Sequence, residues 1–434
     1  MSQNNRKNPF ANIADPVGTA TRRAALKMLD AVLRRGEALD RAQHAATQGI
    51  KNPADRAHAV VIAAETLRHL PDLDALIDSA TKQRIPDDAK SRAVLRLALI
   101  QTLKLGTPAH AAIATALPLV DGGPKRLVHG VFGSLTRGEA ALPELPTLPE
   151  DAETRWQEQW GDDMVEAARH AIAAQPPIDL TLRDASDTDR FASELNGTSL
   201  GSAHVRISEP GNITELAGFD EGAWWVQDIS ASLPARLLGP GDGRTVIDLC
   251  AAPGGKTMQL AAARWDVTGV DISAKRLERL ESNLARTGLV ATLIKGDIEK
   301  WKPETQADAV LLDAPCSATG IFRRHPDVLQ RVGNRQIAEL AELQSKLLAR
   351  AAEWVKPGGI LVYATCSLET SEGEDQISAF LSANPDWQRL PITVEELPDG
   401  FSLNGDGDLR ILPGILAEAG GADGFFISRL QRKS

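Results

Sequence analysis

From residue 245 onward, short continuous apolar runs alternate with segments of helical spacing. Continuous apolar runs are typical of parallel strands, because helices cover both faces of such a sheet. The pattern therefore predicts a doubly wound α/β sheet, in which ligands bind beyond the carboxyl ends of the strands. The expected strands span residues 245–249, 267–271, 292–297, 308–315 and 359–366.

The first third of the chain has a different periodicity. Between Thr21 and Arg137 the apolar residues recur every three or four positions, which predicts a helix bundle. Proline and glycine breaks divide this stretch into five or six helices. The breaks lie at Asn52-Pro53, Pro71-Asp72, Pro86-Asp87 and Asp121-Gly122-Gly123-Pro124.

A proline-rich segment follows the predicted bundle. Residues 141–150, ALPELPTLPE, predict a stiff, extended linker. The next region, up to residue 240, mixes helices near Asp163–Ala174 and Thr188–Leu195 with a strand near Ile178–Leu182 and further short strands. We therefore expect a small mixed domain between the bundle and the α/β sheet.

The composition fits a globular chain of about three domains. The 434 residues are 43% hydrophobic and 24% charged, which excludes disordered and fibrous chains. No apolar run approaches the ~18 residues of a membrane helix, and the terminal MSQNNRKNPF lacks the apolar core of a signal peptide. We expect a cytoplasmic protein with no membrane partner.

Net charge is distributed unevenly along the chain. The whole chain carries −10, but residues 1–140 carry +7, residues 141–240 carry −12 and residues 241–434 carry −5. A basic module on an acidic chain is typical of a protein in which one part binds a polyanion. A helical domain with solvated lysine and arginine side chains explains the same counts, so charge alone leaves both interpretations open.

A glycine turn follows the first expected strand, in DLCAAPGGKT at residues 248–257. Glycine lets the backbone approach a ligand closely at such a turn. Asp271 and Asp297 close the second and third expected strands, where carboxylates hold the ribose of a cofactor in sheets of this kind. The pattern favours a nucleoside cofactor over a polyphosphate, and the alternative is a tight turn with acidic helix caps.

The triplet Gly255-Lys256-Thr257 resembles the end of a phosphate-binding P-loop. That motif needs a glycine five residues before Gly255. Cys250 occupies this position, so the sequence disfavours a P-loop nucleotide hydrolase.

Two of the three cysteines lie at the carboxyl ends of neighbouring expected strands. Cys316 lies in DAPCSATG and Cys366 in ATCSL. A buried cysteine is usually a small hydrophobic residue, but this pairing indicates nucleophilic chemistry. Helix amino termini and nearby cations lower the pKa of a thiol, and both cysteines precede predicted helices. Cys250, inside the glycine turn, is expected to pack and to contact a ligand through its backbone.

Four motifs in this order carry a resemblance to a known family: DLCAAPGGKT, DAPCSATG, RRHPD and YATCSL. Together they resemble the S-adenosylmethionine-dependent RNA cytosine-C5 methyltransferases, in particular the RsmB/Sun/Fmu-type bacterial 16S rRNA branch. The likeness covers residues 227–434, including Gln227-Asp228 and the closing Asp423-Gly424-Phe425-Phe426. The first part of the chain is similar to a NusB-like helical domain, although VHGVFGSLTR at residues 128–137 departs from the usual segment there.

The resemblance implies a multidomain protein of three parts. These are an all-α NusB-like helical RNA-binding domain at residues 15–140, a small α/β (α+β) RNA-binding linker domain at 151–235, and an α/β Rossmann-type methyltransferase domain at 236–434. The implied cofactor is S-adenosylmethionine, converted to S-adenosylhomocysteine, and no metal is implied.

The resemblance also implies roles for individual residues. Cys366 is the thiolate that adds to C6 of cytosine, Cys316 promotes the later elimination, and Asp313 hydrogen-bonds the base and contacts the cofactor. Arg323, Arg324 and His325 follow the Cys316 loop and are expected to hold RNA phosphates, and the alternative is a solvated turn before a helix. The implied cofactor-binding residues are Cys250, Ala251, Ala252, Pro253, Gly254, Gly255, Lys256, Asp271, Asp297 and Asp313.

The implied partner is 16S rRNA before full assembly of the small subunit, and we expect a monomer. One alternative is a non-catalytic RNA-binding factor in ribosome assembly or antitermination. The presence of both cysteines and all three cofactor carboxylates argues against it. A DNA methyltransferase is a third possibility, but it would use the cysteine after proline, Cys316, as its nucleophile and would have less need of Cys366.

Overall fold

The computed structural model describes residues 15–209 and 211–434. Residues 1–14, which include the MSQNNRKNPF segment considered above, and residue 210 lie outside the described residues. Two compact units form: residues up to 149 together with 325–331, and residues 150–324 together with 332–434. The three-part division at the boundaries given above stays a prediction. Within the described residues, no helix is both long and apolar enough to cross a bilayer.

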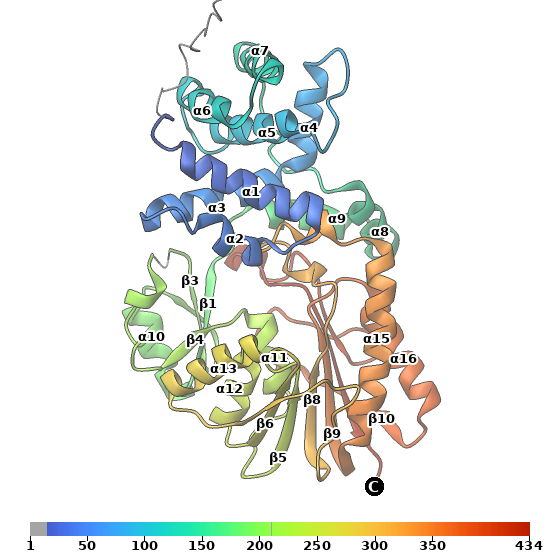
Figure 1. The fold of residues 1–434 in the computed structure, drawn as a ribbon. Helices are drawn as coiled ribbons and strands as arrows, with labels where there is room; N and C mark the ends of the chain where they lie inside the picture. The colour runs from blue at the N-terminus through green and yellow to red at the C-terminus, as the bar shows by residue number, and fades with distance from the viewer. Residues whose placement is uncertain (1–14, 210) are drawn as a thin grey trace, which may run out of the picture. The chain divides into compact units, whose positions relative to one another are not determined.

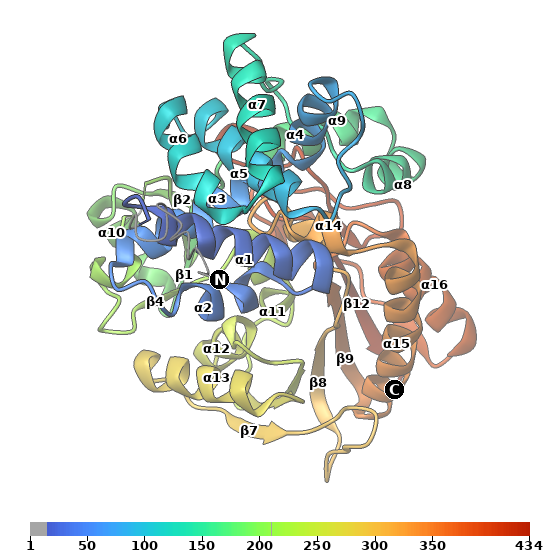
Figure 2. The same ribbon diagram turned by 45° about the horizontal axis from the view of Figure 1, so that its top comes forward.

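The first unit is helical, as the periodicity predicts (Figure 2). A short 3₁₀ turn at Leu117–Leu119 follows its sixth helix, and a single helical turn, α14 (Val328–Arg331), joins the unit from a distant part of the sequence. The other helices are α1 (Thr19–Arg35), α2 (Leu39–Thr47), α3 (Pro53–Arg68), α4 (Leu70–Ser79), α5 (Lys90–Leu103), α6 (Ala109–Ala116) and α7 (Gly123–Arg137).

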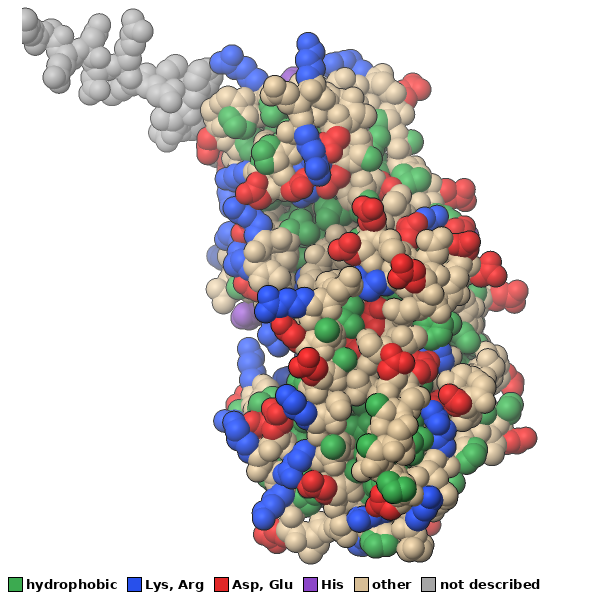
Figure 3. Space-filling model, turned by 90° about the vertical axis from the view of Figure 1, so that its right-hand side faces the viewer, with side chains coloured by type: hydrophobic (Ala, Val, Ile, Leu, Met, Phe, Trp, Pro, Cys, Tyr) green, Lys and Arg blue, Asp and Glu red, His purple; other side chains and the backbone are tan. Residues whose placement is uncertain are grey.

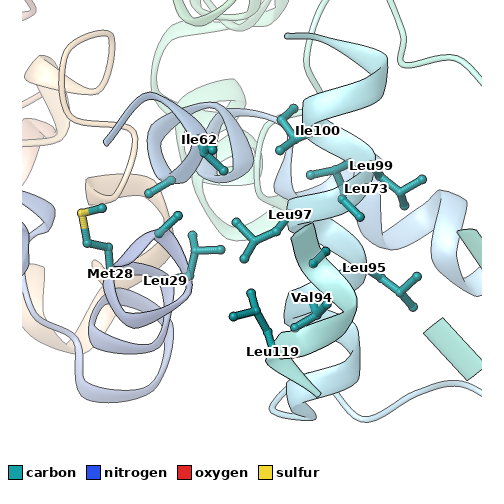
Figure 4. Close-up of a cluster of buried hydrophobic side chains, with 14 of the residues drawn as sticks. Met28, Leu29, Ile62, Leu73, Val94, Leu95, Leu97, Leu99, Ile100 and Leu119 are labelled. Carbon is teal, nitrogen blue, oxygen red and sulfur yellow. The ribbon is translucent and has the colours of Figure 1, made fainter. Parts of the chain in front are cut away.

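Aliphatic side chains from several of these helices form one core (Figure 4). Helix α5 lies at its centre, because almost every side chain from Val94 to Ile100 is buried. Met28 and Leu29 of α1 and Ile62 of α3 pack against it. Each fully buried aliphatic side chain contributes roughly 1.5–3 kcal/mol to stability. This core therefore explains the stability of the helical unit without a disulfide or a bound metal.

The helical unit contains more breaks than the sequence predicted. Helix α1 ends at Gly36, which has a left-handed φ of 65° and donates its amide to the α1 carbonyls. A second break at Gly106-Thr107-Pro108 separates α5 from α6. The prediction of five or six helices was wrong, because the predicted breaks included neither Gly36, an isolated C-terminal cap, nor Gly106-Thr107-Pro108.

The second unit begins with helices α8 (Glu150–Trp160) and α9 (Asp162–Ala173) and a small antiparallel sheet of order β2-β3-β1-β4. The strands are β1 (Ile178–Leu182), β2 (Thr198–Gly201), β3 (His204–Ile207) and β4 (Trp224–Val226), with α10 (Thr188–Glu194) between β1 and β2. The expected helices and the strand at 178–182 are confirmed, whereas α8 was not predicted.

The main sheet has eight strands, with the order β10-β12-β9-β8-β5-β6-β7 and β11 paired to β12 (Figure 1). The five predicted strands are confirmed as its parallel part, and the predicted closing strand at Phe425-Phe426 is antiparallel to β9. The strands are β5 (Thr245–Leu249), β6 (Asp266–Asp271), β7 (Thr292–Lys295), β8 (Ala307–Asp313), β9 (Val355–Thr365), β10 (Trp387–Arg389), β11 (Leu409–Ile411) and β12 (Phe425–Arg432).

Helices cover both faces of this sheet, which explains its continuous apolar strands. On one face, α15 (Asn334–Glu353) and α16 (Glu374–Ala383) pack against alternate strand residues such as Val310 and Leu361. On the other face, α11 (Ile229–Arg236) and α12 (Gly255–Ala262) pack against the intervening residues, such as Leu311. Helix α13 (Ala274–Thr287) connects β6 to β7.

The strand order fixes where a ligand can bind. From β5 the chain proceeds outward to β6 and β7 and then crosses back to β8 on the other side of β5. Such a reversal opens a crevice at the carboxyl ends of the two strands that flank it. The site is therefore expected beyond Leu249 of β5 and Asp313 of β8.

Candidate active site

The glycine turn after β5 is shaped for close approach of its backbone. Gly254 has a left-handed φ of 110°, and a Cβ atom there would lie 2.0 Å from a methyl carbon of Leu280. A Cβ atom on Gly255 would meet the side chain of Gln227 at 3.1 Å. Gly254 is therefore required by the turn, whereas a side chain at position 255 needs a shift of only a few tenths of an ångström in Gln227.

A cavity of 290 Å³ lies against this turn, within the second unit. The predicted turn residues Cys250–Lys256 and Asp313 form one wall. The opposite wall consists of residues from β1, the β4–α11 connection, the loop after Cys316 and the segment before β12. These residues are Asp179, Val226, Gln227, Asp228, Ala231, Arg324 and Asp423, with Asp248 of β5 at the base of the turn.

Asp248 is a buried carboxyl group on this cavity. Its Oδ2 accepts the hydroxyl of Thr257 at 2.5 Å, and its Oδ1 has no partner among the described residues. Burial raises the pKa of Asp248 to about 7, despite the hydrogen bond from Thr257. An unsatisfied buried oxygen is costly, so a donor from a bound ligand or a proton is expected to satisfy it.

Lys256 and Asp313 connect the two strand ends. Lys256 Nζ lies 2.8 Å from Asp313 Oδ2, and their side chains are 11% and 32% exposed. Burial lowers the pKa of Lys256. The charge and hydrogen bond of Asp313, together with the charge of Cys366, raise this pKa by more, so the net shift is upward. Lys256 is therefore a permanent cation next to Asp313.

Cys316 and Cys366 lie side by side. Their sulfur atoms are 3.5 Å apart, at hydrogen-bonding distance, and both residues are half-buried. Adjacent pairing of β8 and β9 brings them together, since each follows the end of its strand. The structure thus places the two predicted cysteines in one constellation.

The two thiols are not equivalent. The hydrogen bond to Cys366 and burial raise the pKa of Cys316 well above its ordinary value, and the charges of Cys366 and Glu372 raise it further. The predicted lowering of thiol pKa by helix termini is wrong for Cys316, because only short 3₁₀ turns follow both cysteines, at Thr319–Ile321 and Thr370–Glu372. A raised pKa disfavours the thiolate form of Cys316.

Cys250 has the environment expected of a packing residue. It adopts a left-handed φ of 61° in the turn. Burial raises its pKa to about 12, with further contributions from the charges of Asp313 and Asp271. A protonated thiol is a poor nucleophile, which agrees with a role in packing.

Asp271 closes β6 and holds the glycine turn. Its carboxylate accepts the amides of Ala252 at 3.2 Å and Ser273 at 2.9 Å, and it pairs with Arg276 at 3.2 Å. The side chain is 1% exposed, and Arg276 also donates to the carbonyl of Ala252. Asp271 contacts the predicted cofactor turn but does not line the cavity.

Asp297 lies one strand farther from the turn. Its carboxylate accepts the amide of Glu299 at 3.1 Å and pairs with Lys300 at 3.1 Å. These two interactions lower its pKa. Asp297 is half-buried beyond the end of β7 and is not among the cavity-lining residues.

Two of the arginines predicted to bind RNA are held by carboxylates. Arg323, 3% exposed, lies 3.1 Å from Asp423 and 3.5 Å from Asp228. Arg324 lies 2.8 Å from Asp228 and 3.2 Å from Asp423, and it lines the cavity. Both guanidinium groups are therefore engaged inside the second unit, and phosphate binding by either stays a prediction.

His325 belongs to the first unit. Its Nδ1 lies 3.7 Å from a carboxylate oxygen of Asp40 in α2, and its side chain is half-buried. A role in RNA binding stays a prediction here as well.

Several residues at the site had no assigned role in the sequence analysis. Asp248 stands within the quoted DLCAAPGGKT motif, and a carboxylate in an apolar strand is a signal that could have identified it. Glu372 offered no comparable signal, because its importance comes from contacts with distant residues. Among the described residues, no group of three or more His, Cys, Asp or Glu side chains is arranged to hold a metal ion.

Comparison with protein families gives two matches along the chain. The family described as 16S rRNA methyltransferase RsmB/F matches residues 235–431, and the NusB family matches residues 19–131. Both matches fall on the regions that carry the resemblance in the sequence analysis.

Two curated proteins are similar to the chain over nearly its whole length. Ribosomal RNA small subunit methyltransferase B of Klebsiella pneumoniae subsp. pneumoniae is 35% identical over 443 residues, which cover 95% of this chain and 98% of that protein. The protein of the same name from Erwinia tasmaniensis is 34% identical over 453 residues, which cover 96% and 99%.

Solved structures resemble the fold. PH0851 has a TM-score of 0.75 at 22% identity and covers 97% of this chain and 99% of its own. NSun6 from Pyrococcus horikoshii with SFG has a TM-score of 0.57 at 18% identity and covers 66% of this chain and 98% of its own. These two likenesses concern the arrangement of helices and strands alone.

Proposed function

Because the chain belongs to the 16S rRNA methyltransferase RsmB/F family, we propose that it methylates C5 of a cytosine in 16S rRNA by covalent catalysis. The observation that carries this proposal is the 3.5 Å separation of the Cys316 and Cys366 sulfur atoms. Cys316 stands three residues after Asp313, which pairs with Lys256 of the glycine turn. A nucleophile, a second thiol and a carboxyl group thus meet at one edge of the sheet.

The residues present fit S-adenosylmethionine. The turn Cys250–Lys256 requires glycine at position 254, where its backbone lines the cavity, and Asp271 fixes the amide of Ala252 in that turn. When bound, S-adenosylmethionine supplies a methyl group on a sulfonium and leaves S-adenosylhomocysteine as the product. The turn, Asp271 and Asp313 hold the cofactor, and Asp297 contributes from the neighbouring strand end.

Cys366 makes the target carbon reactive. C5 of cytosine is a poor nucleophile, so the Cys366 thiolate first forms a bond to C6, and the electron pair of the C5=C6 double bond moves into the ring. The added electron density collects at N3 and at the exocyclic edge. Asp313 hydrogen-bonds this edge and favours protonation at N3, and C5 becomes enamine-like and accepts the methyl group.

Cys316 completes the cycle by removing a proton. After methylation, C5 carries both the methyl group and its original hydrogen. Loss of that proton restores the C5=C6 double bond and breaks the bond from C6 to the Cys366 sulfur, which leaves as a thiolate.

The surroundings of Cys316 support this timing. In the free protein, the hydrogen bond to Cys366, burial and the Cys366 charge keep the pKa of Cys316 high. In the adduct, Cys366 is a neutral thioether, so its charge and its hydrogen bond to Cys316 are lost. The pKa of Cys316 therefore falls once the adduct exists, so the Cys316 thiol can release its proton to solvent and its thiolate is then available to accept the C5 proton.

RNA reaches this site as a single-stranded or extruded base, because a stacked base is inaccessible to a thiol. The helical unit supplies salt-dependent affinity for phosphates, in line with the +7 charge of residues 1–140. On the face drawn in Figure 3, basic and acidic side chains are interspersed, so no uniform basic field covers that face. The proposed substrate is 16S rRNA before full assembly of the subunit, acted on by a cytoplasmic, metal-independent monomer.

The proposal is tested by mapping 5-methylcytosine in 16S rRNA from cells with and without the gene. We expect one cytosine to lose its methyl group when the gene is absent and to regain it when the gene is restored. A methyl-transfer assay on bulk rRNA separates this enzyme from a non-catalytic RNA-binding factor. Binding of rRNA without transfer would contradict the proposal.

A further inference from the structure

Glu372 is a buried carboxylate directly behind the two cysteines. It ends the 3₁₀ turn at Thr370–Glu372, six residues after Cys366, and its side chain is 0% exposed. Its Oε1 accepts the amide of Ser317 at 2.9 Å and the side-chain amide of Gln344 at 2.9 Å. Its Oε2 accepts the hydroxyl of Ser367 at 2.5 Å and also the hydroxyl of Ser317.

Two of the donor residues are the direct neighbours of the two cysteines in the chain. Ser317 directly follows Cys316, and Ser367 directly follows Cys366. One carboxylate therefore fixes the backbone just after both cysteines, and the two serine hydroxyls also lie 3.2 Å from each other.

Two further elements bind Glu372, one through its carboxylate and one through its backbone carbonyl. Gln344 of α15 binds Glu372 and also donates to the carbonyl of Pro315, the residue before Cys316, at 2.9 Å. The backbone carbonyl of Glu372 accepts the hydroxyls of Tyr363 at 2.9 Å and Thr365 at 3.2 Å, both on β9. The loop after β8, the loop after β9 and helix α15 are thus tied at one point.

The charge on Glu372 has no cationic partner at bonding distance among the described residues. These four hydrogen bonds come from neutral groups, and Arg410 donates instead to Glu374 and to the carbonyl of Ser367. A buried carboxylate without a counter-charge is costly. Such groups occur where a site needs their charge or their geometry.

We propose that Glu372 is a positioning residue that fixes the sulfur atoms of Cys316 and Cys366 at hydrogen-bonding distance. This inference rests on the proposed covalent mechanism, in which the two thiols act in sequence on one base. The negative charge of Glu372 also contributes to the raised pKa of Cys316, together with Cys366 and burial. Glu372 thereby helps to keep Cys316 a proton donor while Cys366 attacks.

The test replaces Glu372 by glutamine, which has the same shape and no charge. We expect Glu372→Gln to lower kcat at least tenfold, while the KM values for S-adenosylmethionine and rRNA change less than about threefold, because neither ligand touches Glu372. The matched control is Asp375→Asn, which removes an exposed negative charge three residues away and should leave kcat unchanged.

A second measurement tests, without any RNA, how the charge of Glu372 affects the pKa of Cys316. In a protein whose only cysteine is Cys316, made by Cys250→Ala and Cys366→Ala, the pH midpoint for alkylation by iodoacetamide reports the Cys316 thiol. Tyr363, Glu372 and Arg410 are the remaining titratable groups that act on this region. We expect Glu372→Gln to move the midpoint to lower pH, by about one unit. A purely structural role would leave the midpoint unchanged.

If Glu372→Gln does not fold, the double variant Ser317→Ala, Ser367→Ala decides the question, because it removes two donors and keeps the buried carboxylate. A tenfold loss of kcat in this variant supports the positioning role. A kcat within twofold of the unsubstituted protein, or an unmoved midpoint in Glu372→Gln, overturns it. If the unsubstituted protein shows no methyl transfer, the proposed function fails, and the alkylation midpoint still tests Glu372.

Discussion

Lys256 and Asp313 form a 2.8 Å ion pair that joins the glycine turn after β5 to the end of β8. The pair lies on the wall of the cavity and brings a permanent positive charge next to the carboxyl group assigned to the base. Lys256 Nζ also lies 5.3 Å from the centre of the Phe425 ring. The lysine is thus held by contacts with two strands of the main sheet, β8 and β12.

Replacing Lys256 with methionine should slow methyl transfer. The substitution keeps the length of the side chain and removes the charge beside Asp313. Removal of one electrostatic group from a catalytic site commonly costs about 10²–10³ in kcat, so we expect a loss of at least tenfold in single-turnover assays. Lys346→Met, at an exposed position on α15, is the control. An unchanged rate in Lys256→Met would mean that Lys256 has only a structural role.

Substitutions of the two cysteines should block the reaction at different steps. Cys366→Ala removes the nucleophile, so neither methylation nor a protein–RNA adduct should be observed. Cys316→Ala retains attack and transfer but lacks the base, so a covalent complex with methylated RNA should accumulate as a slow band on a denaturing gel. Cys250→Ala is the control and should behave like the unsubstituted protein. An adduct in Cys366→Ala and none in Cys316→Ala would identify Cys316 as the nucleophile.

Asp271→Ala should weaken S-adenosylmethionine binding. The carboxylate holds the amide of Ala252, and it is assigned to the ribose hydroxyls. Loss of a hydrogen bond to a charged group costs about 1–3 kcal/mol, which isothermal calorimetry can resolve. Asp266→Ala removes an exposed carboxylate at the other end of β6 and should bind normally. Equal affinity in both variants would refute the assignment.

Asp248 should make stability depend on pH. Its pKa is about 7 in the folded protein against an ordinary value of 3.8, so the folded state binds more protons than the unfolded state between these values. The free energy of unfolding should therefore fall as pH rises from about 4 to about 7, by up to about 4 kcal/mol.

Asp248→Asn removes the titrating carboxyl group and keeps an oxygen that accepts the hydroxyl of Thr257. The difference in the free energy of unfolding between pH 5 and pH 8 should shrink by at least about 1 kcal/mol, measured by urea unfolding. Asp266→Asn is the control. A difference as large as in the unsubstituted protein would mean that Asp248 is already ionised at pH 5.

Charge reversal on the helical unit should flatten the dependence of RNA binding on salt. Lys125 and Arg126 are exposed in the first turn of α7. If both contact phosphates, Lys125→Glu with Arg126→Glu should reduce the slope of log affinity against log salt by about 2. Lys346→Glu is the control on the second unit. An unchanged slope would place the phosphate contacts elsewhere.

The strand ends were predictable because their signal is local. Cys316, Cys366 and Asp313 each end or follow an apolar run, and a parallel sheet brings such ends to one edge. The exact neighbours were not predictable, since they come from side-chain packing between distant segments. Glu372 binds Ser317, which is 55 residues away, and Arg323 binds Asp423, which is 100 residues away.

The arginines illustrate the same limit. Three basic residues in a row after a catalytic loop predict a phosphate-binding surface, and nothing in the local sequence indicates that Asp228 and Asp423 lie beside them. Burial of Arg324 lowers its pKa, but these two carboxylates raise it by more, so it stays charged inside the protein. Local composition predicts which groups carry charge, whereas the fold decides whether a charge faces the solvent or another residue.

The helical unit is assembled from two separate stretches of sequence, residues up to 149 and residues 325–331. Asp327 in the second stretch accepts the amide of Leu39 at 3.2 Å, and Gln330 donates to the carbonyl of Leu67 at 3.3 Å. A chimera that exchanged the first 149 residues alone would therefore pair a foreign bundle with the original seven-residue insert. The smallest part that recombination can transfer intact is bipartite, because the side chains of Asp327 and Gln330, encoded far downstream in the gene, bind backbone groups of Leu39 and Leu67.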